Sequence, residues 1–253
     1  RLVGSEMCIR DRLAALGRAK SAIGNVPVSA GRVVDLLREL GVGIDKKKSI
    51  HGVRGVGLRG FEGVDKPIDL DGLGATAPLL LTVLAGQSFT SRVKLGEEVT
   101  RCQPLIDLLV KLGFEIQRET GTAFAVGGGE PEGHVFAEVD ITAELKLGVM
   151  VGALYGEGMT QLPETASNRN RVERLLRGRG VEVERRKDGT GYMVSVMGGQ
   201  AIEALDMEVA GQLDLSYPLL GAALCRKGSK LTVKRVAIHA GQRAFLDLLR
   251  QIG

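Results

Sequence analysis

Two charged residues interrupt one of the most apolar stretches of the sequence. Glu144 and Lys146 stand within residues 139–154, where most other positions are aliphatic residues, glycine or alanine. Such a run predicts a buried helix, and a charge in a buried helix needs a partner or a ligand. A helix start also offers unpaired N–H groups and the positive end of the helix dipole. These residues therefore predict an anion-binding site at the start of a buried helix.

The same arrangement occurs earlier in the chain, in residues 70–91. An acidic, glycine-rich turn containing Gly72 and Gly74 leads into a helix that is apolar on every side and stops at Gly86. A looser copy occupies residues 213–224. Because a helix without a polar face belongs in the interior of a domain, we expect these helices to form the core.

Each of these features also has a purely structural explanation, and the residues alone do not decide between a structural role and ligand binding. Gly72 and Gly74 suit a tight turn without any ligand. Arg169 and Arg171 suit either a solvated helix start or phosphate binding. Short polar side chains that suit helix caps precede the predicted helices at Asp71, Asp140 and Thr142.

A second helical pattern recurs four times along the chain. Each copy is an amphipathic helix that ends in glycine, and the closing glycines are Gly41, Gly113, Gly180 and Gly253. The steps between them are 72, 67 and 73 residues. Glycine is the usual residue for the left-handed conformation that ends a helix. The chain is therefore predicted to be built from repeats.

Each repeat is predicted to contain an apolar helix, a strand, an amphipathic helix and two closing strands. The strand after each apolar helix is predicted at residues 21–26, 88–93, 159–162 and 230–233. In the third copy the closing strands are predicted at 182–186 and 192–196, because the residues between them have turn chemistry.

The repeats predict an α/β fold with βαβαββ units. Helices without a polar face need cover on all sides, so we expect three units to close with threefold pseudosymmetry, helices inside and sheets outside. Residues 13–205 are expected to form this first domain, and residues 206–253 to begin a second domain that is truncated. Residues 1–12 match no part of the repeat and are expected to be a non-native tail.

Composition narrows the class of protein. An apolar fraction of 44% supports a large core, and a net charge of +4 suits small anionic substrates. Tryptophan is absent and other aromatic residues are few, so no nucleic-acid partner is expected. The three cysteines are widely spaced, which predicts neither a disulfide nor a metal site and favours the cytoplasm. The apolar runs are too short for a membrane span.

Three segments resemble the enolpyruvyl transferase family, and most of all its 5-enolpyruvylshikimate-3-phosphate synthases. They are residues 70–91, 168–174 (Asn-Arg-Asn-Arg-Val-Glu-Arg against the family's Ser-Arg-Asp-His-Thr-Glu-Arg) and 206–211. The resemblance implies two domains of three units each, with substrates between them. It also implies transfer of the enolpyruvyl group of phosphoenolpyruvate to the 5-hydroxyl of shikimate 3-phosphate, with release of phosphate, no metal and no cofactor, by a protein that is monomeric when full length.

The resemblance also implies which residues bind these substrates, although several departures from the family pattern occur. Gly74 is the glycine that remains of the family's Asn-Ser-Gly-Thr turn. Gln103 stands where the family has an arginine, and the nearby Arg101 is expected to substitute for it. The family's Ser-x-Gln becomes Thr142, Ala143 and Glu144. A carboxylate that faces a phosphate is unfavourable unless Lys146, Arg169 or Arg171 offsets its charge. The remaining implied binding residues are Lys146, Asn168, Arg169 and Arg171. No catalytic residue is assigned, and the fragment is predicted to be inactive.

Three alternatives remain open from the sequence. The first is a catalytically impaired relative that binds an anion or a partner chain, which the changed site residues favour. The second is the sister enzyme that uses UDP-N-acetylglucosamine and should carry a reactive cysteine on a cleft loop; Cys102 is near such a loop but lacks the surrounding glycines. The third is a nucleic-acid end-processing enzyme with a histidine nucleophile, whereas His51, His134 and His239 are isolated along the chain. Cys102 and Cys225 are expected to be buried thiols.

Overall fold

The computed structural model divides the chain into two units, a larger one of residues 4–207 and a smaller one that contains residues 208–253. The structure describes residues 13–26, 30–47, 50–137, 141–164, 171–208, 211–238 and 240–252. The expected non-native tail, residues 1–12, lies outside this described part.

The first repeat of the larger unit forms a sheet in the order β11-β1-β3-β2. The strands are β1 (Lys20–Gly24), β2 (Gly43–Lys47), β3 (Ile50–Arg54) and the short β11 (Met207–Glu208). Strand β3 is antiparallel to both β1 and β2. The amphipathic helix α2 (Gly31–Glu39) precedes β2 and buries Val33, Val34 and Leu37.

The second repeat forms a sheet in the order β4-β5-β7-β6. Its strands are β4 (Ile68–Asp69), β5 (Ser91–Lys94), β6 (Ile116–Arg118) and β7 (Ala123–Val126). The 3-10 helix η2 (Gly74–Thr76) leads directly into α3 (Ala77–Ala85), and η3 (Gly96–Glu98) leads into α4 (Val99–Lys111). The strand predicted from residue 88 starts only at Ser91, because the residues after Gly86 form a turn.

The third repeat forms a sheet in the order β8-β10-β9. Its strands are β8 (Met159–Glu164), β9 (Val183–Asp188) and β10 (Gly191–Met197), and its helices are α5 (Ala143–Ala153) and α6 (Arg171–Arg177). Strands β9 and β10 form the antiparallel hairpin that the turn sequence predicts, with Asp188 paired to Gly191.

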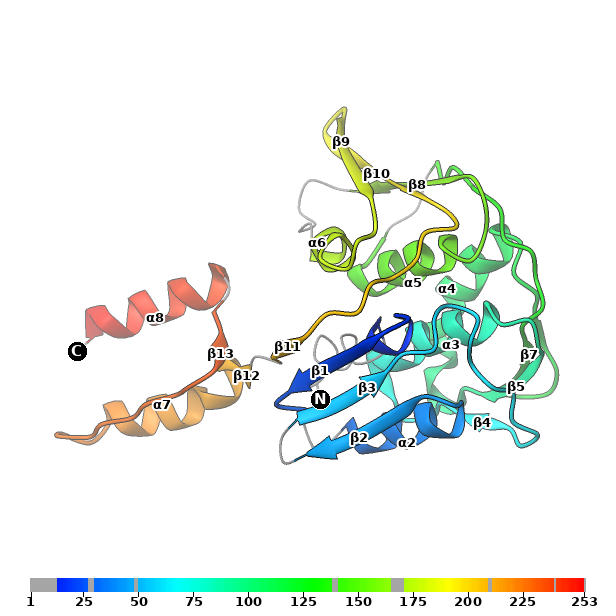
Figure 1. Ribbon diagram of the computed structural model, residues 1–253. Helices are drawn as coiled ribbons and strands as arrows, with labels where there is room; N and C mark the ends of the chain where they lie inside the picture. Colours follow the sequence, from blue (N-terminus) through cyan, green and yellow to red (C-terminus); the bar gives the residue numbers. More distant parts are fainter. Residues whose placement is uncertain are drawn as a thin grey trace. The chain divides into compact units, whose positions relative to one another are not determined.

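The core of the larger unit consists of the apolar helices, with the three sheets around them (Figure 1). All nine residues of α3 are buried, and α3 packs against both α5 and α4. A Cβ atom at Gly148 of α5 would lie only 2.7 Å from the Leu105 side chain of α4, so these two helices approach closely. The prediction of an α/β fold with helices inside and sheets outside is confirmed.

The period of the closing glycines is confirmed within the larger unit. Gly41, Gly113 and Gly180 follow α2, α4 and α6 with φ angles of 88°, 97° and 80°. These are left-handed conformations, which glycine adopts at little cost and other residues rarely adopt. Gly253, the fourth closing glycine, lies outside the described residues.

The smaller unit contains a helical repeat of the same kind. Strands β12 (Gly211–Gln212) and β13 (Val236–Ala237) pair in parallel, and they flank η4 (Leu213–Ser216) and the apolar helix α7 (Tyr217–Leu224). The amphipathic helix α8 (Ala240–Ile252) follows, and the centroid of its Phe245 ring lies 4.2 Å from the centroid of the Tyr217 ring. The strand predicted at residues 230–233 is wrong, because β12 pairs with residues 236–237 instead.

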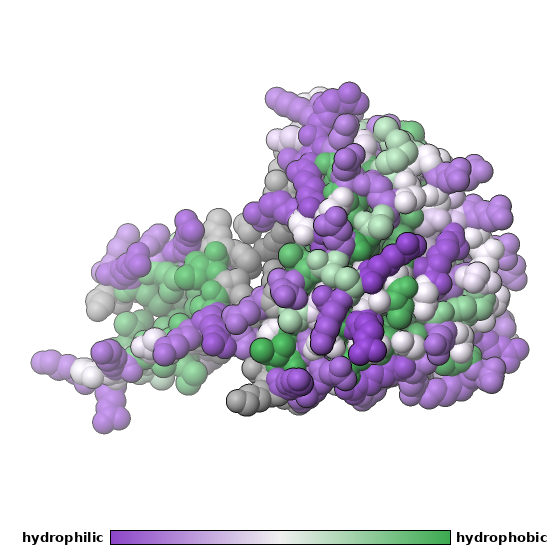
Figure 2. Space-filling model, viewed as in Figure 1, coloured by the Kyte–Doolittle hydropathy of each residue, from purple (hydrophilic) through white to green (hydrophobic). Residues whose placement is uncertain are grey.

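Helix α7 is apolar like α3, but the expectation that it lies in a core is wrong for the described residues. None of its residues is buried, and Leu219 and Leu224 are 60% and 48% exposed. Figure 2 shows hydrophobic residues at the surface of this part of the chain. Cys225 directly after α7 is also exposed, so the expectation of a buried thiol there is wrong. Among the described residues, no helix has the length and hydropathy needed to cross a bilayer.

Candidate functional site

The implied binding residues of the second and third repeats gather at the starts of helices in the larger unit. Gly74 begins η2 with a φ of 57°, and a Cβ atom there would meet no atom within 4 Å. Its N–H donates a hydrogen bond of 2.9 Å to Oε1 of Glu98, the last residue of η3. Glu98 therefore joins the start of η2 to the start of α4.

Arg101 extends this network from α4 to α5. Its Nε lies 3.2 Å from Oε2 of Glu98, and its Nη1 lies 3.0 Å from Oε2 of Glu144 in the first turn of α5. Partial burial disfavours the charged guanidinium, but its hydrogen bonds to Glu144 and Glu98 outweigh this and raise the pKa of Arg101. Gly74, Arg101 and Glu144 are thus brought together, with the Arg101 side chain 45% exposed.

Thr142 caps α5. Its backbone is extended, and its Oγ1 accepts a hydrogen bond of 3.3 Å from the N–H of Leu145. Thr142 and Ala143 are exposed beside the half-exposed Glu144, so the start of this helix of 11 residues faces solvent. The capping explanation and the binding explanation are compatible, since the hydroxyl occupies one amide and leaves the surface of the first turn accessible.

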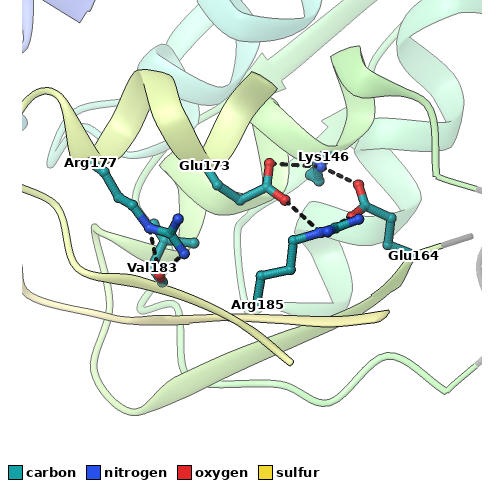
Figure 3. Close-up of polar contacts among 6 residues, drawn as sticks. All are labelled: Lys146, Glu164, Glu173, Arg177, Val183 and Arg185. Carbon is teal, nitrogen blue, oxygen red and sulfur yellow. Dashed lines mark hydrogen bonds and ion pairs between the residues drawn. The ribbon is translucent and has the colours of Figure 1, made fainter. Parts of the chain in front are cut away.

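Lys146 lies apart from these residues although it is only two positions beyond Glu144. Its side chain is 1% exposed, and its ammonium contacts Glu164 and lies 3.0 Å from Oε2 of Glu173 (Figure 3). Of the three cations that the sequence offers to offset Glu144, Lys146 does not contact it; the cation that does is Arg101. Lys146 points into the interior, toward two other carboxylates.

Arg185 completes a buried ion cluster, which consists of the buried Lys146, Glu164 and Glu173 and of Arg185, whose side chain is 18% exposed. The Arg185 Nε lies 2.8 Å from Oε2 of Glu164 and 3.5 Å from Oε1 of Glu173. Its guanidinium carbon also lies 3.4 Å from the centre of the Tyr192 ring, a cation–π contact. Two cations and two carboxylates balance, which is the condition under which charges are tolerated in an interior.

Sequence reasoning missed Glu164, Glu173 and Arg185, although the pattern carried a signal for the two glutamates. Glu164 follows Thr160 and Leu162 at the spacing of two that places all three on the buried face of β8. Glu173 stands three residues before the buried Leu176 and therefore shares its helix face. A carboxylate on an apolar face predicts a buried cation partner.

Only the last residue of the segment 168–171 belongs to the described part of the structure. Asn168 and Arg169 lie outside the described residues, and Arg171 is described only as the first residue of α6. The structure therefore brings together Gly74, Arg101 and Glu144, with Thr142 and Ala143 adjoining Glu144 in the chain. The placement of Asn168, Arg169 and Arg171 in the site stays a prediction from the resemblance.

A cavity of about 350 Å³ lies at the other ends of the core helices, separate from these helix starts. Leu16, Arg18, Leu154 and Ile202 are among its lining residues. Arg59, which also lines it, donates hydrogen bonds of 3.1 Å to the Gly86 carbonyl after α3 and 2.8 Å to the Tyr155 carbonyl after α5. Arg59 thus satisfies helix carbonyls, which is a structural role.

Among the described residues, which do not include His239, the cysteine and histidine alternatives find little support in the geometry. Cys102 is fully buried in α4, and this burial raises its pKa to about 12, so it stays a protonated thiol at neutral pH. His51 belongs to β3, and burial followed by the nearby Lys46 and Arg38 lowers its pKa. Among the described residues, no three His, Cys, Asp or Glu side chains form a group that could hold a metal ion.

Comparison with known proteins places these observations in one family. The family model for EPSP synthase (3-phosphoshikimate 1-carboxyvinyltransferase) matches residues 12–253. The 3-phosphoshikimate 1-carboxyvinyltransferase of Bacillus licheniformis is 30% identical over 247 residues, which cover 94% of this chain and 56% of that protein. The enzyme of the same name from Alkalilimnicola ehrlichii is 30% identical over 249 residues, with 95% and 55% covered. The chain thus spans about half the length of the curated relatives it matches.

Solved structures agree on the fold. EPSP synthase from Acinetobacter baumannii superposes with a TM-score of 0.82 at 21% identity, covering 98% of this chain and 57% of that one. The enolpyruvyl transferase NikO from Streptomyces tendae gives a TM-score of 0.66 at 15% identity, covering 86% and 53%. Both carry the enolpyruvyl transferase fold that the repeats and the resemblance predict.

Proposed function

This chain belongs to the EPSP synthase family, and we propose that it serves the reaction that the family name describes. In that reaction the 5-hydroxyl of shikimate 3-phosphate adds to phosphoenolpyruvate, and phosphate leaves as the enolpyruvyl ether forms. The chain spans about half the length of its relatives, and we assign to it the binding of shikimate 3-phosphate as its part in that reaction.

The observation that carries this proposal is the polar network at the starts of η2, α4 and α5. Glu98 binds the Gly74 N–H and Arg101, and Arg101 in turn binds Glu144. The guanidinium is partly exposed, so it can exchange a carboxylate for a phosphate oxygen without leaving its place. The positive end of α5 adds to the attraction for an anion.

We propose the following residues as the binding set, on the strength of the resemblance and of this network: Gly74, Arg101, Thr142, Ala143, Glu144, Asn168, Arg169 and Arg171. The protein is proposed to need no metal and no organic cofactor. It is also proposed to act in the cytoplasm, without nucleic acid or membrane, as a monomer when full length. Cys102 and Cys225 are free thiols, which supports a reducing compartment.

The second candidate function is binding without turnover. It is favoured by one observation, the presence of two carboxylates, Glu98 and Glu144, around the single guanidinium of Arg101. They compete with a bound phosphate for that cation, and a carboxylate close to a phosphate costs on the order of 1 kcal/mol. Such a protein would bind an anionic ligand weakly and release no phosphate.

Calorimetry of the 253-residue chain with shikimate 3-phosphate tests the proposal, together with a phosphate-release assay after phosphoenolpyruvate is added. We expect saturable binding that Arg101→Gln weakens about tenfold. Arg92→Gln is the matched control, because Arg92 is an exposed arginine paired with Glu119 on another part of the unit. Absence of binding, or equal weakening by both variants, contradicts the proposal. Binding with phosphate release would exclude the second candidate.

A further inference from the structure

The buried ion cluster connects three elements that are separate in the sequence. Lys146 lies in the first turn of α5, Glu164 is the last residue of β8, and Glu173 is the third residue of α6. The chain from β8 to α6 runs through residues 165–170, so the two glutamates stand on either side of this connection. One ammonium therefore binds both flanks of a single connection.

The geometry of the cluster is that of a fixed structural contact rather than a binding surface. The side chains of Lys146, Glu164 and Glu173 are 1%, 0% and 0% exposed. The Lys146 ammonium has hydrogen-bond contacts with both carboxylates. If the buried Lys146 ammonium turned toward a dissolved ligand, the two buried carboxylates would have only Arg185 as a cation partner. This would be unfavourable, because a buried charge needs a partner.

We propose that Lys146 is a positioning residue, which holds the end of β8 and the start of α6 at a fixed place beside the start of α5. This inference rests on the proposed function in one respect, since α6 begins at Arg171 and α5 begins with the proposed binding residues Ala143 and Glu144. Lys146 thus acts on ligand binding through the placement of α6 and never contacts the ligand.

The residues that surround Lys146 distinguish this role from a simple balance of charge. Arg185 binds the same two glutamates but comes from β9, which follows α6 in the chain. Lys146 comes from α5, so its bonds alone within the buried ion cluster join the flanks of the connection to the helix that carries Thr142–Glu144. Removal of Lys146 leaves the glutamates paired with Arg185 but releases them from α5.

The test uses two variants of the full 253-residue chain. Lys146→Met keeps the aliphatic stem but leaves two carboxylates with one cation, so it is expected to be poorly stable. Lys146→Met/Glu173→Gln restores neutrality, because Glu164 and Arg185 remain as a pair. The double variant is therefore expected to unfold cooperatively, with a midpoint much nearer to that of the wild type.

Two measurements on the double variant decide the question. We expect amide hydrogen exchange in peptides that cover α6 and the end of β8 to become about tenfold faster, with no change in α4. We also expect the dissociation constant for shikimate 3-phosphate to rise about tenfold. Wild-type exchange in α6, or wild-type affinity despite faster exchange, would show that Lys146 only balances charge and would overturn the inference.

Val196→Ala is the matched control for stability. Val196 is buried in β10 and pairs with Val183 and Thr160, which are not members of the ion cluster, so its truncation weakens the same repeat without removing a neighbour of Arg185. We expect unchanged affinity for shikimate 3-phosphate in this variant; an equal loss of affinity would overturn the positioning role. If the wild-type chain does not bind shikimate 3-phosphate at all, the proposed function fails, and the exchange of α6 then supports or overturns the positioning role by itself.

Discussion

The Arg101 guanidinium lies 3.0 Å from the Glu144 carboxylate and thereby links the first turn of α4 to the first turn of α5. The side chains are 45% and 33% exposed, so the pair is expected to stabilise the fold by less than about 1 kcal/mol. The pair has a greater effect on the charge of the proposed phosphate site. Glu144 places a negative group where the resemblance implies a glutamine, and it occupies the arginine proposed to bind phosphate.

Glu144→Gln is therefore predicted to strengthen the binding of shikimate 3-phosphate. Removing a like charge near the phosphate is worth on the order of 1 kcal/mol, which is about fivefold in affinity. Isothermal titration calorimetry measures the change, with Glu119→Gln as control because Glu119 is an exposed carboxylate paired with Arg92. Weaker binding by Glu144→Gln would mean that Glu144 holds Arg101 in its binding geometry and that this attraction exceeds the repulsion.

Elements whose structure depends on their own residues could be predicted, and elements that depend on a distant partner could not. The helices α3 and α5 were predictable because a helix without a polar face favours burial, and Gly41, Gly113 and Gly180 marked the ends of α2, α4 and α6. The same reasoning failed for α7, none of whose residues is buried. The strand at 230–233 was predicted wrongly, because the register of a two-residue parallel pair depends on β12 rather than on local residue types.

The candidate site was less predictable, because its contacts join distant parts of the chain. The sequence distinguishes Lys146 as an unusual charge, but its partners lie 18 and 27 residues away. Local patterns do not show which of several acidic residues reaches a buried ammonium. The same holds for Glu144, whose cation is Arg101, 43 residues earlier, rather than the nearby Lys146.

Arg59 is predicted to stabilise the larger unit by closing the ends of two core helices. It donates to the carbonyls of Gly86 and Tyr155, and Arg59→Ala leaves both without this donor at a cost of about 1–2 kcal/mol. Urea unfolding of the variant measures the loss. Arg18→Ala is the control, because Arg18 is an exposed arginine that lines the same cavity. Equal losses in the two variants would refute a specific contribution of Arg59.

The two described cysteines are predicted to react very differently with iodoacetamide at about pH 8. Cys225 is exposed, whereas Cys102 is fully buried and its pKa is raised to about 12, so almost no Cys102 thiolate forms. Peptide mass spectrometry is expected to find Cys225 alkylated and Cys102 unmodified until urea is added. Rapid modification of native Cys102 would contradict the burial and would restore the alternative that needs a reactive cysteine.

Stability is predicted to fall in alkaline solution. Burial raises the pKa of Cys102 from 9.0 to about 12, and burial also raises the pKa of Tyr155 above 10.0. The unfolded chain therefore loses these protons first, so this stability is fully present below about pH 9 and is lost as pH rises toward the folded pKa values.

Urea unfolding at pH 8, 9, 10 and 11 measures this loss, which is at most about 1.4 kcal/mol per pH unit for each group. Cys102→Ala is the control, since it removes the thiol and should make the decline between about pH 9 and 10 shallower. A free energy of unfolding that stays constant across this range would show that neither group is protected from ionisation in the native state.

Gly86→Ala is predicted to destabilise the larger unit, because the glycine makes room for an aromatic ring. A Cβ atom at this position would lie 2.3 Å from Cε1 of Tyr155. The ring has little freedom to move, since Tyr155 is buried and packs edge-on against Phe114. Forcing an additional methyl group into such packing costs about 1–3 kcal/mol.

Gly31→Ala is the matched control, because Gly31 begins α2 and a Cβ atom there would meet no atom within 4 Å. Replacing glycine by alanine in a helix stabilises by up to about 1 kcal/mol, so the two variants should shift the urea midpoint in opposite directions. A shift of the same sign and size in both would mean that Tyr155 can move away from α3 freely and that the ring does not fix the packing at this end of the core.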